Sequence, residues 1–255
     1  MLSQTKSNIL YIKQRYYMIL HIPHSSTDTL DYKFLHKERE LLRMTDHYTD
    51  DLYGCADAKR VVFELSRLVC DVERFQDDEQ EPMSRFGMGV CYTKNSEGNK
   101  LRVVTDANKE YIISNYYIPH HHELSSAVDD ELAHSTKALI IDCHSFPDKA
   151  YRFNNDFNQK RPDICIGTDS YHTPKGLLEE TKKYFLSKGY VVQVNKPYSG
   201  SIVPMKHYKK DKRVLSIMIE INRKLYMDEH GFKTEHYEDL KEEIHELLIH
   251  LNHLY

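Results

Sequence analysis

The chain has 255 residues, with 35 Lys and Arg against 39 Asp and Glu, so its formal net charge is −4. This slight acidity excludes the global basic field that nucleic-acid-binding proteins use. No apolar run approaches the roughly 18–20 residues of a membrane helix. The 40% hydrophobic and 11% aromatic shares argue against a disordered chain and predict a folded core. Histidine is unusually frequent, with 16 residues against 9 glycines and 8 prolines.

The five cysteines are odd in number and widely spaced, without a CxxC motif, which argues for a reducing compartment and against a disulfide framework. The N-terminal segment carries Lys6, Lys13 and Arg15 within its apolar stretches, so it lacks the continuous apolar core of a signal peptide. These features predict a cytoplasmic protein.

The apolar pattern predicts alternating strands and helices. In chain order these are a strand at 17–22, a helix at 33–53, strands at 61–63 and 68–72, a helix at 111–137 with a potential break at Pro119, strands at 139–143 and 163–166, a helix at 174–188, strands at 190–194 and 215–221, and a helix at 234–253. Strands that are almost wholly apolar favour a largely parallel sheet with both faces covered. Without repeats or linkers, we expect one α/β/α domain over 1–255.

Reactive side chains follow or interrupt several of these apolar runs. His24 follows the first strand, His144 ends the strand at 139–143, and Glu220 lies inside the strand at 215–221. Ligand sites in such sheets lie at the carboxyl ends of strands. Two histidines and one carboxylate, with a coordination position left open, form a catalytic zinc pattern. The alternative is that each histidine is an ordinary core residue with a backbone partner.

The carboxylate ligand is expected from the segment 45–51, where Asp46 and Asp50 are four residues apart and can share a helix face. Glu220 is the candidate general base, because a partly desolvated carboxyl group has a raised pKa. It could instead face solvent from an edge strand. Arg74 and Arg223 favour an anionic small-molecule substrate, because guanidinium groups bind carboxylates bidentately, unless they form ordinary surface ion pairs.

Segments spread along the chain are similar to those of a known family. They are IPHSS at 22–26, TDHYTDDLY at 45–53, RLVCDVERF at 67–75, YIPHHHEL at 117–124, LIIDCHS at 139–145, PDICIGT at 162–168, VNKPYSG at 194–200 and IMIEINRKLYMDE at 217–229. In this order, the chain resembles the N-formylglutamate amidohydrolases, distant relatives of the zinc carboxypeptidases. The resemblance implies a three-layer, zinc-carboxypeptidase-like (phosphorylase/hydrolase-like) fold with a mostly parallel mixed sheet.

The resemblance also implies a set of site residues. The implied ligands of one zinc ion, or of another divalent metal, are His24, Asp46 and His144, and Glu220 is the implied general base. The implied substrate contacts are Arg74, His121, Asn195 and Arg223, and the residues expected to orient the ligands are Asp142 and Ser145.

The chain departs from the family pattern at two places. Carboxypeptidase-like enzymes usually supply two ligands from an HxxE motif, but the third residue after His24 is Thr27. Asp46 is chosen because it follows the family's Thr-Asp element, with Asp50 as the alternative. The family often has Asn-Arg where this chain has Glu73 and Arg74. An ionised Glu73 would repel a substrate carboxylate, so the substrate is open.

The resemblance implies a zinc-dependent amidohydrolase that cleaves an N-acyl amino acid such as N-formylglutamate into formate and the free amino acid. The expected partner is this small anionic substrate, with no nucleic acid and no membrane. The alternatives are a metallo-carboxypeptidase or another N-acyl amino-acid deacylase on the same fold, or a non-catalytic binding protein that has lost the metal.

Overall fold

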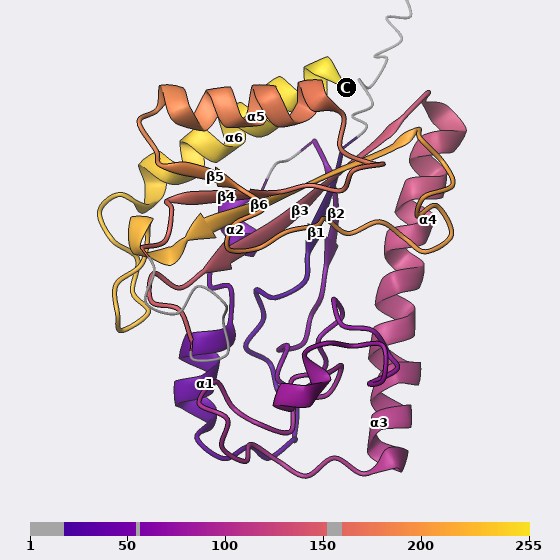
Figure 1. The fold of residues 1–255 in the computed structure, drawn as a ribbon, viewed down its shortest axis with the longest axis vertical. Helices are drawn as coiled ribbons and strands as arrows, with labels where there is room; N and C mark the ends of the chain where they lie inside the picture. The colour runs from indigo at the N-terminus through magenta and orange to yellow at the C-terminus, as the bar shows by residue number, and fades with distance from the viewer. Residues whose placement is uncertain (1–17, 55–56, 152–159) are drawn as a thin grey trace, which may run out of the picture.

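The computed structural model describes residues 18–54, 57–151 and 160–255. A six-stranded sheet with the order β2-β1-β3-β6-β4-β5 forms its centre (Figure 1). The strands are β1 (Met18–Ile22), β2 (Lys59–Val62), β3 (Ala138–Phe146), β4 (Ile164–Gly167), β5 (Val192–Val194) and β6 (Val214–Asn222). All neighbouring strands are parallel except β4 and β6, which pair antiparallel. The expected mostly parallel mixed sheet is therefore confirmed.

Helices cover both faces of the sheet. They are α1 (Lys37–Met44), α2 (Thr49–Leu52), α3 (Asp106–Ile112), α4 (Ile118–His134), α5 (Lys175–Ser187) and α6 (Tyr237–Leu254). Figure 1 shows α5 and α6 side by side on one face and α4 on the other, which gives the three layers. Among the helices of the described ranges, none has the length and apolar character needed to cross a bilayer.

The strand β1 shows how the sequence produces the layers. Successive strand side chains point to opposite faces, so Met18 and Leu20 join the core beneath α5 and α6, whereas Ile19 packs toward α4. All three are fully buried, and each such burial contributes roughly 1.5–3 kcal/mol. A strand buried on both faces has no polar alternation, which explains its continuous apolar sequence.

Two predicted elements differ in the structure. Residues 68–72 form turns rather than a strand, although Leu68 and Val72 are buried, because an apolar run alone does not distinguish a buried loop from a buried strand. The helix expected at 33–53 is divided into α1 and α2 by the segment 45–48. This division separates Asp46, which lies between the helices, from Asp50, which lies within α2.

The helix expected at 111–137 begins earlier, at Asp106, ends earlier, at His134, and is not broken at Pro119. A π-helical turn, Ile113–Tyr117, joins α3 to α4, so that Figure 1 shows one long helix along the sheet. Pro119 follows the π-helical turn closely, so the regular hydrogen-bond pattern is already interrupted where its N–H is missing.

Candidate active site

A cavity of about 320 Å³ lies at the carboxyl edge of the parallel strands. This volume is in the lower range of small-molecule pockets. Its walls come from the segments after β1 and β3, from β6 and from the loops that carry Asp46 and Glu73. The charged residues lining it are His24, Arg43, Asp46, Arg67, Glu73, Arg74, His144, Glu220 and Arg223. Residues distant in sequence, including most of the predicted site, therefore meet at one edge of the sheet.

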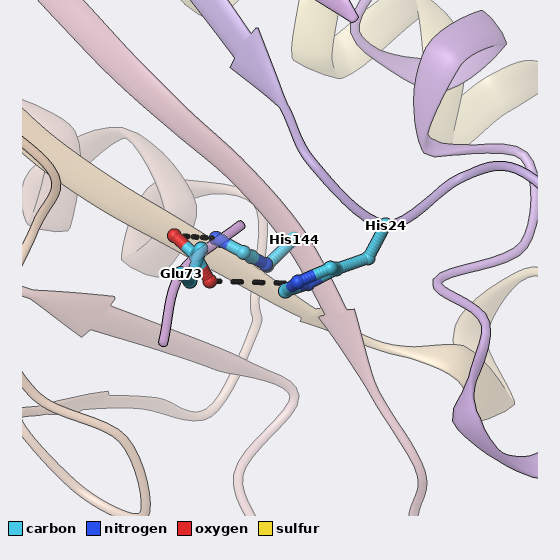
Figure 2. Close-up of side chains that lie close together, drawn as sticks. All are labelled: His24, Glu73 and His144. Atoms are coloured by element: carbon cyan, nitrogen blue, oxygen red, sulfur yellow. Dashed lines mark hydrogen bonds and ion pairs between the residues drawn. The ribbon is translucent and has the colours of Figure 1, made fainter. Parts of the chain in front are cut away.

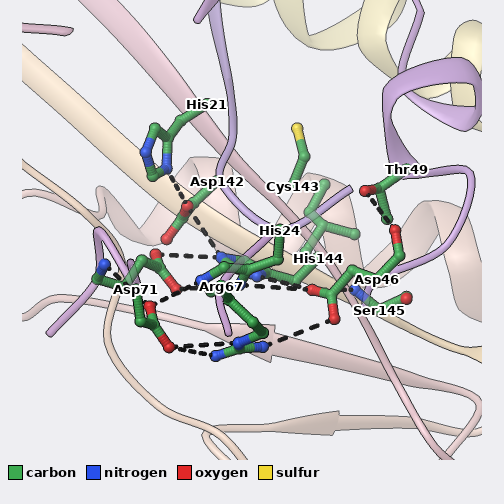
Figure 3. Close-up of polar contacts among 12 residues, drawn as sticks. His21, His24, Asp46, Thr49, Arg67, Asp71, Asp142, Cys143, His144 and Ser145 are labelled. Atoms are coloured by element: carbon green, nitrogen blue, oxygen red, sulfur yellow. Dashed lines mark hydrogen bonds and ion pairs between the residues drawn. The ribbon is translucent and has the colours of Figure 1, made fainter. Parts of the chain in front are cut away.

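His24 is held by a buried carboxylate. Its Nε2 lies 2.8 Å from Asp71 Oδ1, and Asp71 Oδ2 in turn accepts a hydrogen bond from Arg67 Nη2 at 2.8 Å (Figure 3). Asp71 Oδ2 also accepts a hydrogen bond from Tyr92 Oη at 2.7 Å. Because a carboxylate only accepts, the Nε2 of His24 carries the proton. Its buried Nδ1 has no hydrogen-bond partner in the described part of the chain, so a lone pair is available there.

His144, near the end of β3, has a similar arrangement. Its Nε2 lies 3.1 Å from Asp142 Oδ1 and 3.2 Å from Glu73 Oε1, while its Nδ1 lies 3.2 Å from Asp46 Oδ2. The same Asp46 oxygen is 3.7 Å from His24 Nδ1. The Nδ1 atoms of both histidines therefore face one carboxylate oxygen, while each Nε2 has a carboxylate behind it.

Asp46 is fixed at its position from several directions. Its backbone N–H donates to the carbonyl of His24 at 2.9 Å. Its Oδ1 pairs with Arg223 Nη2 at 2.9 Å, and its Oδ2 accepts the backbone N–H of Ser145 at 3.2 Å. The break between α1 and α2 is what allows Asp46 to leave the helical face and enter the site.

The electrostatics of the site favour a cation. Burial alone would lower the histidine pKa values, yet Glu73, Asp142 and Asp46 raise the pKa of His144 well above its usual range. The pKa of His24 is also raised despite burial and the nearby guanidinium group, by Asp71 and Asp46. The negative potential that stabilises a proton on each ring would also attract a metal ion.

The donor set fits a divalent transition metal. Ligands about 2.0–2.1 Å from zinc in a tetrahedron are about 3.3 Å apart, close to the 3.2 Å between His144 Nδ1 and Asp46 Oδ2. His24, Glu73 and His144 form a group whose ligand atoms all lie within 4.8 Å of one another (Figure 2). Asp46 is not part of that group, but its Oδ2 lies 3.7 Å from His24 Nδ1 and 3.2 Å from His144 Nδ1. The orphaned Nδ1 of His24 supports the fit, because buried polar atoms rarely lack a partner.

Glu220 lies on β6 directly opposite His144 on β3. Its side chain is buried, and its Oε2 has no hydrogen-bond partner among the described residues. Burial, with further contributions from Asp46 and Glu73, raises its pKa to about 7. A carboxyl group with this pKa can both accept and release a proton near neutral pH.

The two arginines predicted to bind substrate differ in how far their guanidinium groups are already engaged by other protein groups. Arg223 lines the cavity, but its guanidinium group contacts Asp46, Ser145 Oγ and the backbone carbonyl of Arg43. Arg74 also lines the cavity, and its buried Nε lacks a hydrogen-bond partner within the described ranges, although it lies 3.6 Å from Asp71 Oδ2. Arg74 is therefore the better placed of the two to bind an anion.

Three other predicted positions lie away from the cavity. His121 Nε2 donates to the carbonyl of Val72 at 2.7 Å, so the ring is used in packing α4 against that loop. Asn195 binds Thr168 at the edge of the sheet. Asp50 is exposed on α2. Since the cavity is lined by none of these side chains, the structure does not bring them together with the site.

Several residues that complete the site are not among those predicted from the sequence. Asp71 and Arg67 were not expected to support His24, although their i, i+4 spacing was an available signal of an ion pair. In the run 120–122, His120 rather than His121 turns toward the strands, where its Nε2 lies 3.0 Å from His21 Nε2.

Comparisons with known proteins agree with this architecture. A family model described as N-formylglutamate amidohydrolase matches residues 16–227. No curated protein matches the chain significantly. A solved structure of N-formylglutamate amidohydrolase from Ralstonia eutropha is similar, with a TM-score of 0.82, 23% identity and 94% of each chain covered. A gene product of Agrobacterium tumefaciens has a TM-score of 0.62 at 18% identity, with 92% of each chain covered.

The two structural similarities, both at low identity, concern the fold. The family match spans most of the chain, including every segment that contributes to the cavity. It places the protein among hydrolases that act on an amide bond. The chain therefore belongs to the N-formylglutamate amidohydrolase family.

Proposed function

We propose that the protein is a zinc-dependent amidohydrolase that converts N-formylglutamate, or a closely similar N-acyl amino acid, and water into formate and the free amino acid. The observation that carries the proposal is the convergence of His24 Nδ1 and His144 Nδ1 on Asp46 Oδ2, at 3.7 and 3.2 Å, beside Glu220. The family match supports the amide-hydrolysing chemistry.

His24, Asp46 and His144 would hold the metal. A bound divalent metal, zinc in the first instance, supplies Lewis acidity, which lowers the pKa of a water to about 7 and polarises the acyl carbonyl. We favour Asp46 over Glu73 as the carboxylate ligand because Arg223 and Ser145 fix it between the two rings. Glu73 is partly exposed, at 19%, and its Oε1 lies 3.2 Å from His144 Nε2, so it could add a further ligand.

Glu220 is proposed as the general base and acid. Its free Oε2 takes a proton from the attacking water as the new carbon–oxygen bond forms. The same carboxyl group then gives the proton to the nitrogen as the carbon–nitrogen bond breaks, which releases the amine of the amino acid. A pKa of about 7 suits both directions of transfer.

Arg74 is proposed to bind a carboxylate of the substrate through its guanidinium group, whose Nε lies 3.6 Å from Asp71 Oδ2 but makes no hydrogen bond among the described residues. The charge of Glu73 does not contradict this role. Its two oxygens lie 3.2 Å from His144 Nε2 and 3.8 Å from His24 Nδ1, so the carboxylate is directed at the metal-binding rings. A metal cation between these groups would further offset its repulsion of an anionic substrate.

The cavity also bears on the alternative functions. A volume of about 320 Å³ suits a small N-acyl amino acid better than an extended peptide, which disfavours a carboxypeptidase. A non-catalytic binding protein is disfavoured because the metal-binding side chains and the candidate base are all present. Deacylation of another small N-acyl amino acid remains the competing activity for the same site.

The proposal is tested by assaying a panel of substrates with protein of defined metal content. Protein stripped with a chelator is assayed with N-formyl-, N-acetyl- and N-succinylglutamate, other N-formyl amino acids and short peptides, before and after one equivalent of zinc is added. We expect zinc-dependent release of formate, fastest for N-formylglutamate. Hydrolysis that does not depend on any divalent metal would contradict the metal site, and a preference for another acyl group would reassign the substrate.

A further inference from the structure

A chain of buried polar side chains extends from the site to the opposite layer of the fold. His21 on β1 lies next to Asp142 on β3, and the two are register partners in the sheet. His120, in the first turn of α4, packs over them with 5% of its surface exposed. His21 is fully buried within a strand that is otherwise apolar, where a polar side chain needs partners.

For neutral imidazole rings at His21 and His120, the donor and the acceptor of each hydrogen bond in this series of side chains can be assigned consistently. Asp142 can only accept, so His21 Nδ1 donates to its Oδ1 at 2.8 Å. His21 Nε2 then carries a lone pair and accepts from His120 Nε2 at 3.0 Å. His144 Nε2 also donates to Asp142 Oδ1, at 3.1 Å, so its Nδ1, which lies 3.2 Å from Asp46 Oδ2 and donates to it in the metal-free ring, is the nitrogen that a metal would take over.

Asp142 depends on these hydrogen-bonded side chains because no permanently charged group pairs with it in the described part of the protein. Its ion-pair partners in the described ranges are the two rings of His21 and His144, with no lysine or arginine among them. Its other oxygen accepts the backbone N–H of Ile202, at 3.0 Å. Loss of the His21 donor would therefore leave the carboxylate free to rotate away from His144.

We propose that His21, supported by His120, is a positioning residue that holds Asp142 and thereby fixes the ring orientation and tautomer of His144. The inference rests on the proposed function, since it concerns the presentation of His144 Nδ1 to the metal. Groups that orient a ligating histidine in this way typically alter metal affinity about 10–100-fold when they are removed.

A competing interpretation uses the same residues. His21, Glu73 and Asp142 form a second group whose ligand atoms lie within 4.8 Å of one another, so they could hold a second cation. The hydrogen-bond chain favours the positioning role, because both ring nitrogens of His21 already have partners. The two interpretations predict different zinc stoichiometries.

The experiment compares His21→Leu, which removes the donor, with His21→Asn, whose amide N–H can replace it. His172→Leu is the matched control, because His172 is also buried and hydrogen-bonded at both ring nitrogens but lies outside the site. Zinc affinity and stoichiometry are measured by chelator competition. Thermal unfolding of the metal-free proteins and kcat and KM at saturating zinc are measured in parallel.

We expect one equivalent of zinc in the unmodified protein and an affinity about 10–100-fold lower in His21→Leu. His21→Asn should recover most of this loss, and His172→Leu should lose thermal stability without losing zinc affinity. At saturating zinc, His21→Leu should lower kcat while KM changes little, because His21 does not line the cavity.

Two results would overturn the positioning role. One is an unchanged zinc affinity in His21→Leu, and the other is a second equivalent of zinc in the unmodified protein that His21→Leu abolishes. Failure of the unmodified protein to bind zinc at all would instead overturn the proposed function, together with the inference that rests on it.

Discussion

The two histidines of the site are supported by carboxylates of different character. Asp71, behind His24, pairs with Arg67 and accepts the hydroxyl of Tyr92, whereas Asp142, behind His144, has His21 and a backbone N–H (Figure 3). One carboxylate is thus balanced by a guanidinium group that stays charged at every relevant pH. The other is held by the imidazole rings of His21 and His144 and a backbone N–H, none of which is a permanent cation.

This difference predicts that Asp71, behind His24, and Asp142, behind His144, contribute differently to stability and to function. An ion pair between buried partners is costly to break, because the remaining charge is left without compensation. A carboxylate held by imidazole rings and a backbone N–H, without a lysine or arginine, can be altered at lower cost. Asp71 should therefore contribute strongly to the stability of the fold, while Asp142 should contribute mainly to the orientation of the His144 ring.

The largest expected difference is between Asp71→Asn and Asp142→Asn. Arg67 is only 13% exposed, so Asp71→Asn should lower the free energy of unfolding of the metal-free protein by about 3–5 kcal/mol. Asp142→Asn should cost about 1–3 kcal/mol. Both should weaken zinc binding about 10–100-fold. Urea unfolding and chelator competition measure the two quantities, and equal losses of stability would contradict the proposed division.

A second, smaller effect concerns protons displaced by the metal. Nearby carboxylates raise the pKa values of His144 and His24, so protons compete with a metal for these rings in the metal-free protein. A metal must displace a proton from Nδ1, so zinc affinity should fall as the pH is lowered. Calorimetric titration in buffers of different ionisation enthalpy should show proton release at pH 7. An affinity that is constant between pH 6 and pH 8 would contradict this electrostatic account.

The smallest effect on stability and zinc affinity is expected for a residue that supports neither histidine. Asp50→Asn alters an exposed carboxylate that does not line the cavity, so its effect on the free energy of unfolding should be within about 0.5 kcal/mol. Zinc affinity should also be unchanged. A marked loss of zinc affinity would restore Asp50 as a ligand in place of Asp46.

The sequence predicted the centre of the site better than its surroundings. His24, His144 and Glu220 were recognisable because each is a polar residue at or near the end of an apolar strand, and parallel strands bring such ends together. The helix break that carries Asp46 into the site was not recognisable from helical spacing. The Thr-Asp element of the family resemblance identified Asp46 instead.

The supporting residues depend on contacts that local sequence does not contain. His21 lies 121 residues from its partner Asp142, and its position inside an apolar strand gave no indication of that partner. In the histidine run of α4, a difference of one residue changes the direction of a side chain by about 100°. His121 was chosen there, whereas His120 has the buried contact with His21.

The most direct test of the central claim is the zinc content and turnover of Glu220→Gln. This substitution keeps the size of a side chain that is not among the proposed ligands, so the variant should retain one equivalent of zinc. Its rate of N-formylglutamate hydrolysis should fall about 10²–10⁴-fold, because the amide cannot accept the proton from water. Near-normal turnover with zinc retained would contradict the role of Glu220 as the base in this site.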